Sequence, residues 1–264
     1  MPLPNSYLIS ISFLGFRFHG WAKQKNLLTV HGCIDKTLAY CLPNKKFKTI
    51  GCSRTDSKVS ALDYKFQLWL DQPLQHPETF LKLFNRHLPS DIKAHELETI
   101  AADFDLIGCK KMKTYHYRIW PTELMPPFYA PFYLPVSPTI NIERMREGAK
   151  LFEGQHNFIN YASDNKVDKN YFRKISSCKL TSPSTNNLSE LPITQPDESL
   201  FFIIEAEGFL RHQIRLMMGQ LLNLGIGIIS LNDIRKSLIC KLDQPFKEIA
   251  PASPLTLQKV IFSR

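Results

Sequence analysis

The chain has 264 residues, of which 44% are hydrophobic and 22% charged, a composition typical of a folded globular protein and unlike that of a disordered one. Lysine and arginine outnumber aspartate and glutamate by 33 to 24, which gives a net charge of +9 and a pI near 9.2. A basic chain favours polyanionic partners, so nucleic acid, an anionic membrane surface and acidic substrates are all candidates. No apolar run approaches the roughly 20 residues that a bilayer requires, so we expect no membrane span.

The six cysteines are scattered along the chain, with no C-x-x-C pair and no Cys/His cluster at zinc-ligand spacing. The N-terminal residues also lack a basic segment followed by an apolar stretch, which an export signal would show. We therefore expect a cytoplasmic protein with reduced, mostly buried thiols and no bound metal.

The first hundred residues are expected to fold as strand, helix, strand, strand, helix and strand. Residues 7–13 and 65–70 alternate in polarity and are rich in β-forming residues, which predicts strands. Residues 29–41 carry apolar side chains at helical spacing, and Thr29 is the expected N-cap. The remaining elements are a strand at 47–52, a helix at 78–88 and a strand at 92–100. This order is that of a ferredoxin-like, RRM-like split βαβ unit.

The second half is predicted to repeat this alternation with longer insertions, and the boundary divides the chain into residues 1–103 and 104–264. The predicted strands are 114–119, 176–181, 201–207 and 258–262, and the predicted helices are 142–152, 213–224 and 232–239. Residues 121–138, dense in proline and aromatics, and the polar residues 183–196 are predicted loops.

The most pointed local feature is the polar loop that follows the strand at 47–52. It places Arg54, Asp56 and Lys58 two residues apart. Cationic neighbours keep a carboxylate ionised, which suits a nucleophile or a general base. The alternative is a structural turn in which Asp56 caps a helix or pairs with a surface lysine.

A second candidate segment combines lysines with alternating tyrosines. Lys110, Lys111 and Lys113 precede Tyr115 and Tyr117, which should face one side of a strand. Aromatic rings beside cations suit unstacked RNA, because rings stack on bases while lysines meet phosphates. The alternative is a solvated basic edge with tyrosines in the core.

The third segment opens the apolar helix at 213–224. A glycine turn after a strand brings Arg211 and Arg215 near a helix N-terminus, which favours anions. Arg215 is followed by apolar residues, so its guanidinium needs a carboxylate or phosphate partner. The alternative is that the aliphatic part of its side chain lies along the apolar surface and the guanidinium reaches solvent. His212 is interpreted as a loop residue rather than a ligand.

In this order, the three segments resemble the active-site motifs of the TruA family of tRNA pseudouridine synthases. Arg54-Thr55-Asp56 is similar to the R-T-D loop of the family, residues 113–117 to its (K/R)-x-Y-x-Y strand, and residues 208–215 to its G-F-L-x-x-x-x-R segment. Lesser matches fill the gaps: G-W-A-K-Q at 20–24, N-R-H-L-P-S-D-I at 85–92, G-Q-H-N-F at 154–158 and A-P-A at 250–252.

The chain also departs from the family pattern. Lys58 stands where the family has a glycine, Ser53 replaces the glycine before the arginine, and Ile107 stands where an RNA-contacting arginine is usual. Residues 13–15 are F-L-G in place of Y-D-G, and Pro254 replaces a glycine. These departures leave Asp56, Tyr115 and Arg215 in place and affect the surface expected to bind RNA.

The resemblance implies an α+β fold of two ferredoxin-like halves that share an antiparallel sheet, with helices on one side and a central basic cleft. It implies a homodimer that acts on tRNA without a cofactor, with the anticodon stem-loop as the expected target. Asp56 would be the catalytic carboxylate, acting on the ribose as nucleophile or base. Tyr115 would stack on the uracil and could assist proton transfer. Arg54 would contact the RNA or fill the space that the flipped base leaves, and Arg215 would pair with Asp56 and hold it ionised. Lys110, Lys111 and Lys113 would contact phosphates.

Two other hypotheses stay open at this point. A catalytically silent RNA-binding protein on the same fold would explain the departures at Lys58 and Ile107. An unrelated basic α+β protein would make the motif matches coincidental.

Overall fold

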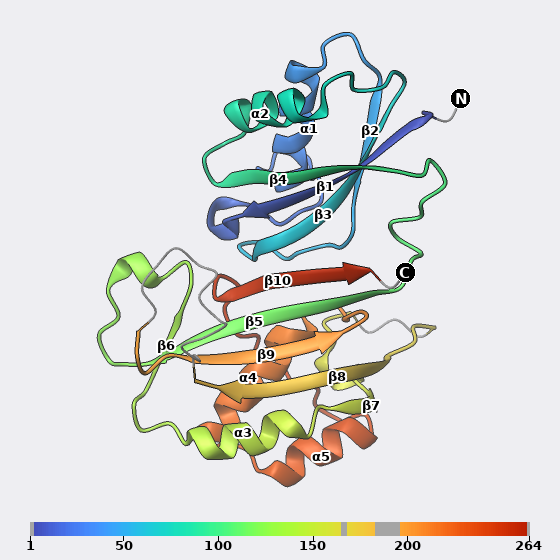
Figure 1. Ribbon diagram of the computed structural model, residues 1–264. Coiled ribbons are helices and arrows are strands. Elements are labelled where there is room, and N and C mark those ends of the chain that lie inside the picture. Colours follow the sequence, from blue (N-terminus) through green and yellow to red (C-terminus); the bar gives the residue numbers. More distant parts are fainter. Residues whose placement is uncertain (1–2, 165–167, 183–195, 263–264) are drawn as a thin grey trace. The chain divides into compact units, whose positions relative to one another are not determined.

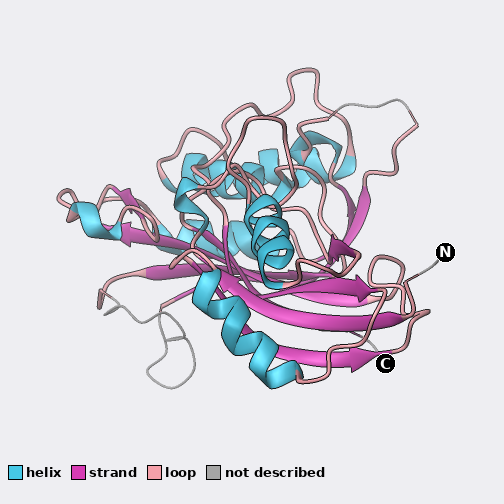
Figure 2. Cartoon of the chain, turned by 90° about the horizontal axis from the view of Figure 1, so that it is seen from above, coloured by secondary structure: helices cyan, strands magenta, loops and turns pink. Residues whose placement is uncertain are grey.

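The computed structural model describes residues 3–164, 168–182 and 196–262 (Figure 1). The chain folds into two compact units. Unit 1 comprises residues 1–110 and 257–264, and unit 2 comprises residues 111–256. Within the described residues there are ten strands and five α-helices, and the strands pair in mostly antiparallel fashion. Figure 2 shows that long loops and turns link these elements.

Unit 1 has the order strand, helix, strand, strand, helix, strand that was predicted. Its elements are β1 (Asn5–Phe13), α1 (Val30–Cys41), β2 (Phe47–Gly51), β3 (Ser60–Leu70), α2 (Pro77–His87) and β4 (Ile92–Ile100). Strand β1 lies between β4 and β3, and β2 pairs with the far side of β3, all antiparallel. The two helices contact each other, and α2 also contacts β4.

Local sequence explains where the two helices of unit 1 begin and which faces they bury. The Thr29 side chain accepts a hydrogen bond from the Gly32 N–H at 3.2 Å, which confirms the predicted N-cap of α1. Helix α2 begins at Pro77, whose missing N–H costs nothing in the first turn. Phe80 and Phe84, one turn apart, form its buried face.

Unit 2 contains β5 (Lys111–Pro121), β6 (Leu134–Val136), α3 (Ile142–Lys150), β7 (Gly154–Asn157), β8 (Phe172–Thr181), β9 (Leu200–Ala206), α4 (Gln213–Gly225) and α5 (Leu231–Ile239). The strand order is β5–β9–β8–β7, and β6 pairs in parallel with the end of β5. Helix α3 packs against α4, α5 and β8 (Figure 1). The last strand, β10 (Leu255–Phe262), begins in unit 2 and continues in unit 1.

Several strands begin earlier than predicted. Strands β3 and β8 begin at Ser60 and Phe172 rather than at residues 65 and 176. Their first residues are mixed in polarity, so they lack the apolar alternation on which the prediction depended, but backbone pairing to neighbouring strands extends through them. The short strands β6 and β7 were not predicted, because three or four residues cannot establish a periodicity.

The predicted loop at 121–138 contains a 3₁₀ turn at Pro127–Tyr129 as well as β6. The predicted loop at 183–196 lies, except for Pro196, outside the described residues. In the part of the chain that is described, no helix is long and apolar enough to cross a membrane.

Candidate active site

The R-T-D motif lies in the loop of residues 52–59, which joins β2 to β3. Main-chain hydrogen bonds tie this loop to an earlier segment. The Lys58 N–H donates to the Phe18 carbonyl at 2.9 Å, and the Trp21 N–H donates to the Thr55 carbonyl at 3.4 Å. The shape of the loop is therefore held by backbone groups as well as by the side chains that it presents.

Within this loop Arg54 is exposed and Asp56 is half-buried. The Val59 N–H donates to the Asp56 carbonyl at 3.2 Å, which closes the turn after the aspartate. Gly20 lies against the loop in the left-handed region, with φ of +85°, and a Cβ there would come within 2.4 Å of the Thr55 carbonyl oxygen. Only glycine permits this close approach.

A buried tyrosine supports the start of the loop. The Tyr64 hydroxyl accepts a hydrogen bond from the Ser53 N–H at 3.3 Å and donates one to the Ser53 carbonyl. The Trp21 ring stacks on the Tyr64 ring with centroids 4.1 Å apart. A Cβ at residue 51 would lie 2.1 Å from the Tyr64 hydroxyl oxygen, so Gly51 is required here. Trp21 and Tyr64 therefore form a rigid support for the loop.

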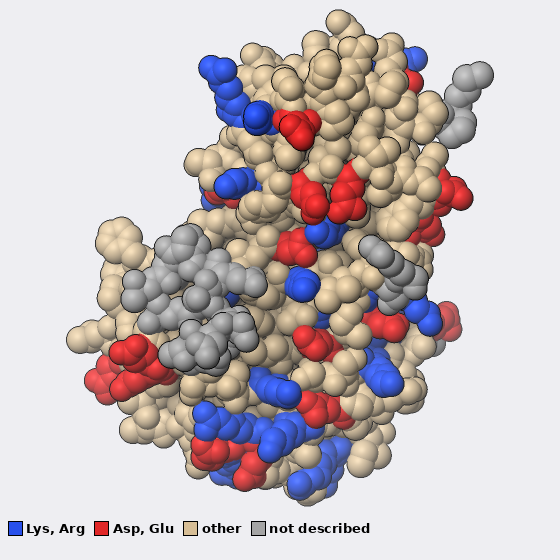
Figure 3. Space-filling view, in the orientation of Figure 1, with Lys and Arg blue, Asp and Glu red and all other residues tan. Residues whose placement is uncertain are grey.

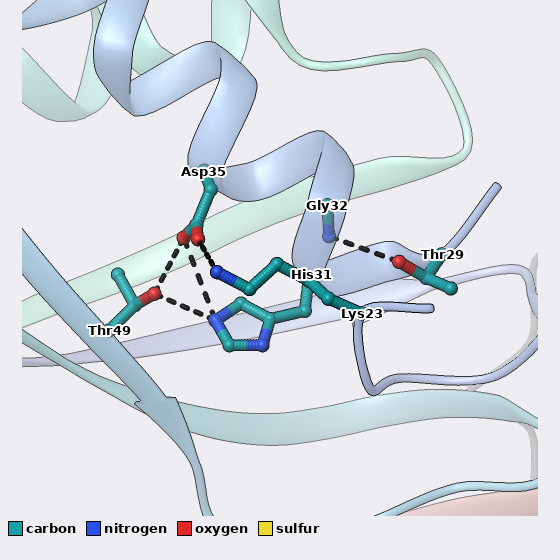
Figure 4. Close-up of polar contacts among 6 residues, drawn as sticks. All are labelled: Lys23, Thr29, His31, Gly32, Asp35 and Thr49. Atoms are coloured by element: carbon teal, nitrogen blue, oxygen red, sulfur yellow. Dashed lines mark hydrogen bonds and ion pairs between the residues drawn. The ribbon is translucent and has the colours of Figure 1, made fainter. Parts of the chain in front are cut away.

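A polar cluster supports Trp21 in turn (Figure 4). The His31 ring stacks on Trp21 at 5.1 Å, and its Nε2 lies 2.7 Å from the Thr49 hydroxyl oxygen. The Thr49 hydroxyl donates to Asp35 at 2.5 Å, and the Lys23 ammonium binds the same carboxylate at 2.5 Å. Burial lowers the pKa of His31 against the opposing effect of Asp35, so the neutral ring donates to Thr49 at neutral pH.

Lys58 adopts a backbone conformation that favours glycine. Its φ of +68° lies in the left-handed region, where a residue with a Cβ is disfavoured by about 1 kcal/mol. The glycine expected at this position from the family pattern therefore has a conformational reason, and this chain places a lysine in the same conformation.

The K-x-Y-x-Y motif lies on β5, where both tyrosines are buried. The ring of Tyr115, which is 6% exposed, meets the edge of Phe209 with centroids 5.4 Å apart. The hydroxyl of the fully buried Tyr117 donates to the Pro251 carbonyl at 2.9 Å. Burial raises the pKa of Tyr117, and the charge of Arg215 acts in the opposite direction. The phenol of Tyr117 therefore stays protonated at neutral pH.

The three lysines of this segment differ in exposure. Lys110 is exposed, Lys113 is half-buried and Lys111 is 8% exposed. Lys110 is at the end of the first continuous segment of unit 1, and the other two lie on β5 in unit 2.

The other face of β5 carries two buried polar side chains that sequence reasoning missed. Arg118 is 1% exposed, and its Nη1 donates to the Thr256 hydroxyl at 2.8 Å while its guanidinium lies 5.5 Å from the Phe201 ring centroid. His116 is 4% exposed, and burial, assisted by the charge of Arg118, lowers its pKa to about 4. The Y-H-Y-R alternation is typical of a strand with one solvated face, but both faces of β5 are covered here.

We expect His116 to make the protein less stable below neutral pH. Its pKa is lower in the folded chain than the ordinary 6.5, so the unfolded chain binds the extra proton. The free energy of unfolding should fall as pH drops from 6.5 towards 4, by at most about 3 kcal/mol from this residue. Urea unfolding of His116→Phe across this range should show a flatter profile, whereas the exposed control His76→Ala should follow wild type. Parallel profiles for His116→Phe and wild type would contradict this expectation.

Arg215 lies in the first turn of α4, just after His212, whose φ is +61°. The half-buried Arg215 donates from Nε to the Ala250 carbonyl at 2.8 Å, and its own carbonyl accepts the Ala250 N–H at 3.1 Å. A Cβ at Gly219 would lie 2.3 Å from the Glu248 carbonyl oxygen, so the chain passes very close to α4 there. The A-P-A segment is thus fixed by Arg215 at Ala250 and by Tyr117 at the next residue.

The predicted site residues fall into two groups. Arg54 and Asp56 belong to unit 1, and Tyr115 and Arg215 belong to unit 2. Within unit 2 the structure brings the strand motif, the α4 motif and the A-P-A segment together. Among the described residues, no group of three or more His, Cys, Asp or Glu side chains is placed to hold a metal ion. On the face drawn in Figure 3, basic and acidic side chains are interspersed.

Comparison with known proteins assigns the class. Residues 149–263 match a family model described as tRNA pseudouridine synthase, so the chain falls in a class of RNA-modifying enzymes. The tRNA pseudouridine synthase A of Aquifex aeolicus is 33% identical over 261 residues, which cover 98% of this chain and all of that protein. The tRNA pseudouridine synthase A 2 of Bacillus anthracis is 29% identical over 259 residues, with the same coverage. The tRNA pseudouridine synthase A of a Hydrogenobaculum species is 29% identical over 263 residues, which cover 97% of this chain and 99% of that protein.

This chain belongs to the tRNA pseudouridine synthase family. The finding confirms the resemblance carried by the R-T-D, K-x-Y-x-Y and G-F-L-x-x-x-x-R segments.

Proposed function

We propose that this chain isomerises uridine to pseudouridine in tRNA, with Asp56 as the catalytic carboxylate. Similarity over 98% of the chain to a protein named for this reaction carries the proposal. The rigid support of the R-T-D loop adds to it, because a catalytic carboxylate must be held in a fixed position.

The reaction breaks the N-glycosidic bond, turns the uracil and reattaches it through carbon, and it requires no cofactor. The target base must first leave its stack, at a cost of a few kcal/mol. Asp56 acts on the ribose as nucleophile or base. Tyr115 stacks on the uracil, and Arg54 contacts the RNA beside Asp56. The proposed role of Arg215 is to pair with the Asp56 carboxylate and keep it ionised.

Lys110, Lys111 and Lys113 contribute contacts to phosphates, which position the RNA without reading its sequence. We further propose that the enzyme acts on the anticodon stem-loop as a cytoplasmic homodimer. These finer assignments depend on the resemblance to the family.

We also propose that residues 1–103 and residues 104–264 each form a ferredoxin-like fold, and that a basic cleft lies between these two halves. The strand order β4–β1–β3–β2 within unit 1 supports the first, because it is the order of a ferredoxin-like βαββαβ unit. In unit 2 the arrangement β8–β9–β5, with α3 between β5 and β8 along the chain, supports the second.

Release of tritium from tRNA labelled at C5 of uracil tests the proposed activity, because the isomerisation replaces that hydrogen with the new bond to the ribose. We expect the purified chain to release tritium in proportion to the pseudouridine formed. A chain that binds tRNA but releases no tritium would instead be a silent RNA-binding protein, which the departures at Lys58 and Ile107 would favour. Mapping pseudouridines in RNA from cells lacking the gene would then identify the modified positions.

A further inference from the structure

An exposed aromatic ring lies beside the loop that carries Asp56. Phe16 is 41% exposed, in the 3₁₀ turn of residues Gly15–Arg17, whose N-terminal end follows β1. The ammonium of Lys58 lies 5.8 Å from the centroid of the Phe16 ring. We call this pair the Phe16–Lys58 platform.

The platform is held firmly against the candidate active site. The Gly15 N–H donates to the Ser60 hydroxyl oxygen at 2.9 Å, and a Cβ at Gly15 would lie 2.0 Å from the Val59 carbonyl oxygen. After the turn, the Phe18 carbonyl accepts the Lys58 N–H at 2.9 Å and the Ser57 hydroxyl at 3.3 Å. These hydrogen bonds tie the turn to the loop. Lys58 itself follows the candidate catalytic aspartate by two positions in the chain.

The charge of Lys58 is available to a ligand. Lys58 is exposed, and no acidic side chain in the described parts of the chain forms an ion pair with it. The nearby Arg17 differs, because its guanidinium binds Asp91. An unneutralised cation above an exposed ring offers a site for a phosphate and a flat base together.

Backbone strain indicates that the lysine side chain has a use. At φ of +68° a glycine would fit without strain, yet this chain carries a lysine there. Residues held in disfavoured backbone conformations by the surrounding structure cluster at functional sites.

We propose that the Phe16–Lys58 platform binds an unpaired nucleotide of the tRNA next to the reacting uridine, with the base stacked on Phe16 and a phosphate bound to Lys58. This proposal rests on the proposed function. It adds a binding contact located where the chain departs from the family pattern.

The test uses tRNA labelled at C5 of uracil, with affinity and turnover measured on the full chain. Phe16→Leu keeps an apolar side chain but removes the ring face, and we expect it to raise Kd and KM for tRNA about tenfold with kcat unchanged. Tyr40→Leu is the matched control, because Tyr40 is an aromatic residue 67% exposed near the end of α1. It should bind tRNA as wild type does.

Lys58→Gly separates binding from folding. Removal of the strain should raise Tm by about 2 °C, while the loss of one phosphate contact should weaken tRNA binding several-fold. The slope of log Kd against log salt should also fall by about 0.7 to 0.9. Lys82→Ala, at an exposed lysine on α2, should change neither affinity nor slope.

Wild-type affinity and KM in both Phe16→Leu and Lys58→Gly would overturn the proposal, as would losses matched by the two controls. The result would be distinct from failure of the proposed function, in which wild type itself releases no tritium.

Discussion

Asp56→Asn is expected to lower pseudouridine formation by at least about a hundredfold, because removal of a nucleophile or general base costs at least this much. The change keeps the size of the side chain. Hydrogen bonds hold the loop around it: the Lys58 N–H donates to a carbonyl of the earlier segment, and the Thr55 carbonyl accepts from that segment. The Tyr64 hydroxyl also accepts a hydrogen bond from the Ser53 N–H. We therefore expect Tm and tRNA affinity to stay close to those of wild type.

Tritium release under single-turnover conditions measures the chemical step of this variant apart from binding. Glu78→Gln is a suitable control, since it makes the same chemical change at an exposed position on α2. Turnover of Asp56→Asn within about tenfold of wild type would remove Asp56 from the catalytic role.

Replacement of Arg215 is expected to have the second-largest effect. Arg215→Leu should reduce turnover severely, because it removes the cation proposed to pair with Asp56. Arg215→Lys should recover only part of the activity, since a point charge cannot replace a planar guanidinium with several donors. The Nε bond to the Ala250 carbonyl at 2.8 Å would also be lost in Arg215→Leu, so some destabilisation accompanies the loss of activity.

A double variant separates the catalytic role of Arg215 from its structural one. If Arg215 and Asp56 act as a unit, Asp56→Asn combined with Arg215→Leu should be about as inactive as the more damaging single variant. Thermal unfolding of each variant reports the structural part. A purely structural Arg215 would give reduced Tm with kcat unchanged in the folded fraction, and Arg215→Lys would then restore Tm and activity together.

The motifs could be found from sequence because each is a short run of residues that keeps its chemistry in any packing. The R-T-D run, the lysine and tyrosine alternation and Arg215 all lie in contiguous segments. The support beneath the loop could not be found in this way. Trp21 and Tyr64 are distant in the sequence and meet by stacking at 4.1 Å, and nothing in either local segment indicates that contact.

Two side chains on β5 have an environment that the local sequence does not indicate. His116 and Arg118 alternate with tyrosines as the solvated face of a strand would, yet they are 4% and 1% exposed. An alternating pattern specifies which side chains share a face, but not what covers that face. The buried neutral His116 is a consequence of this second covering.

By itself, the sequence determined the order of most helices and strands, the N-cap at Thr29 and the identity of the candidate catalytic groups. These features depend on periodicity and on hydrogen bonds between residues a few positions apart, which local sequence specifies. Only the tertiary structure decided the left-handed backbone at Lys58, the exposure of Phe16 beside it and the contact of Arg215 with Ala250. Each of these features depends on the packing of segments that are distant in the sequence. That packing decides which groups are buried and which can contact a ligand.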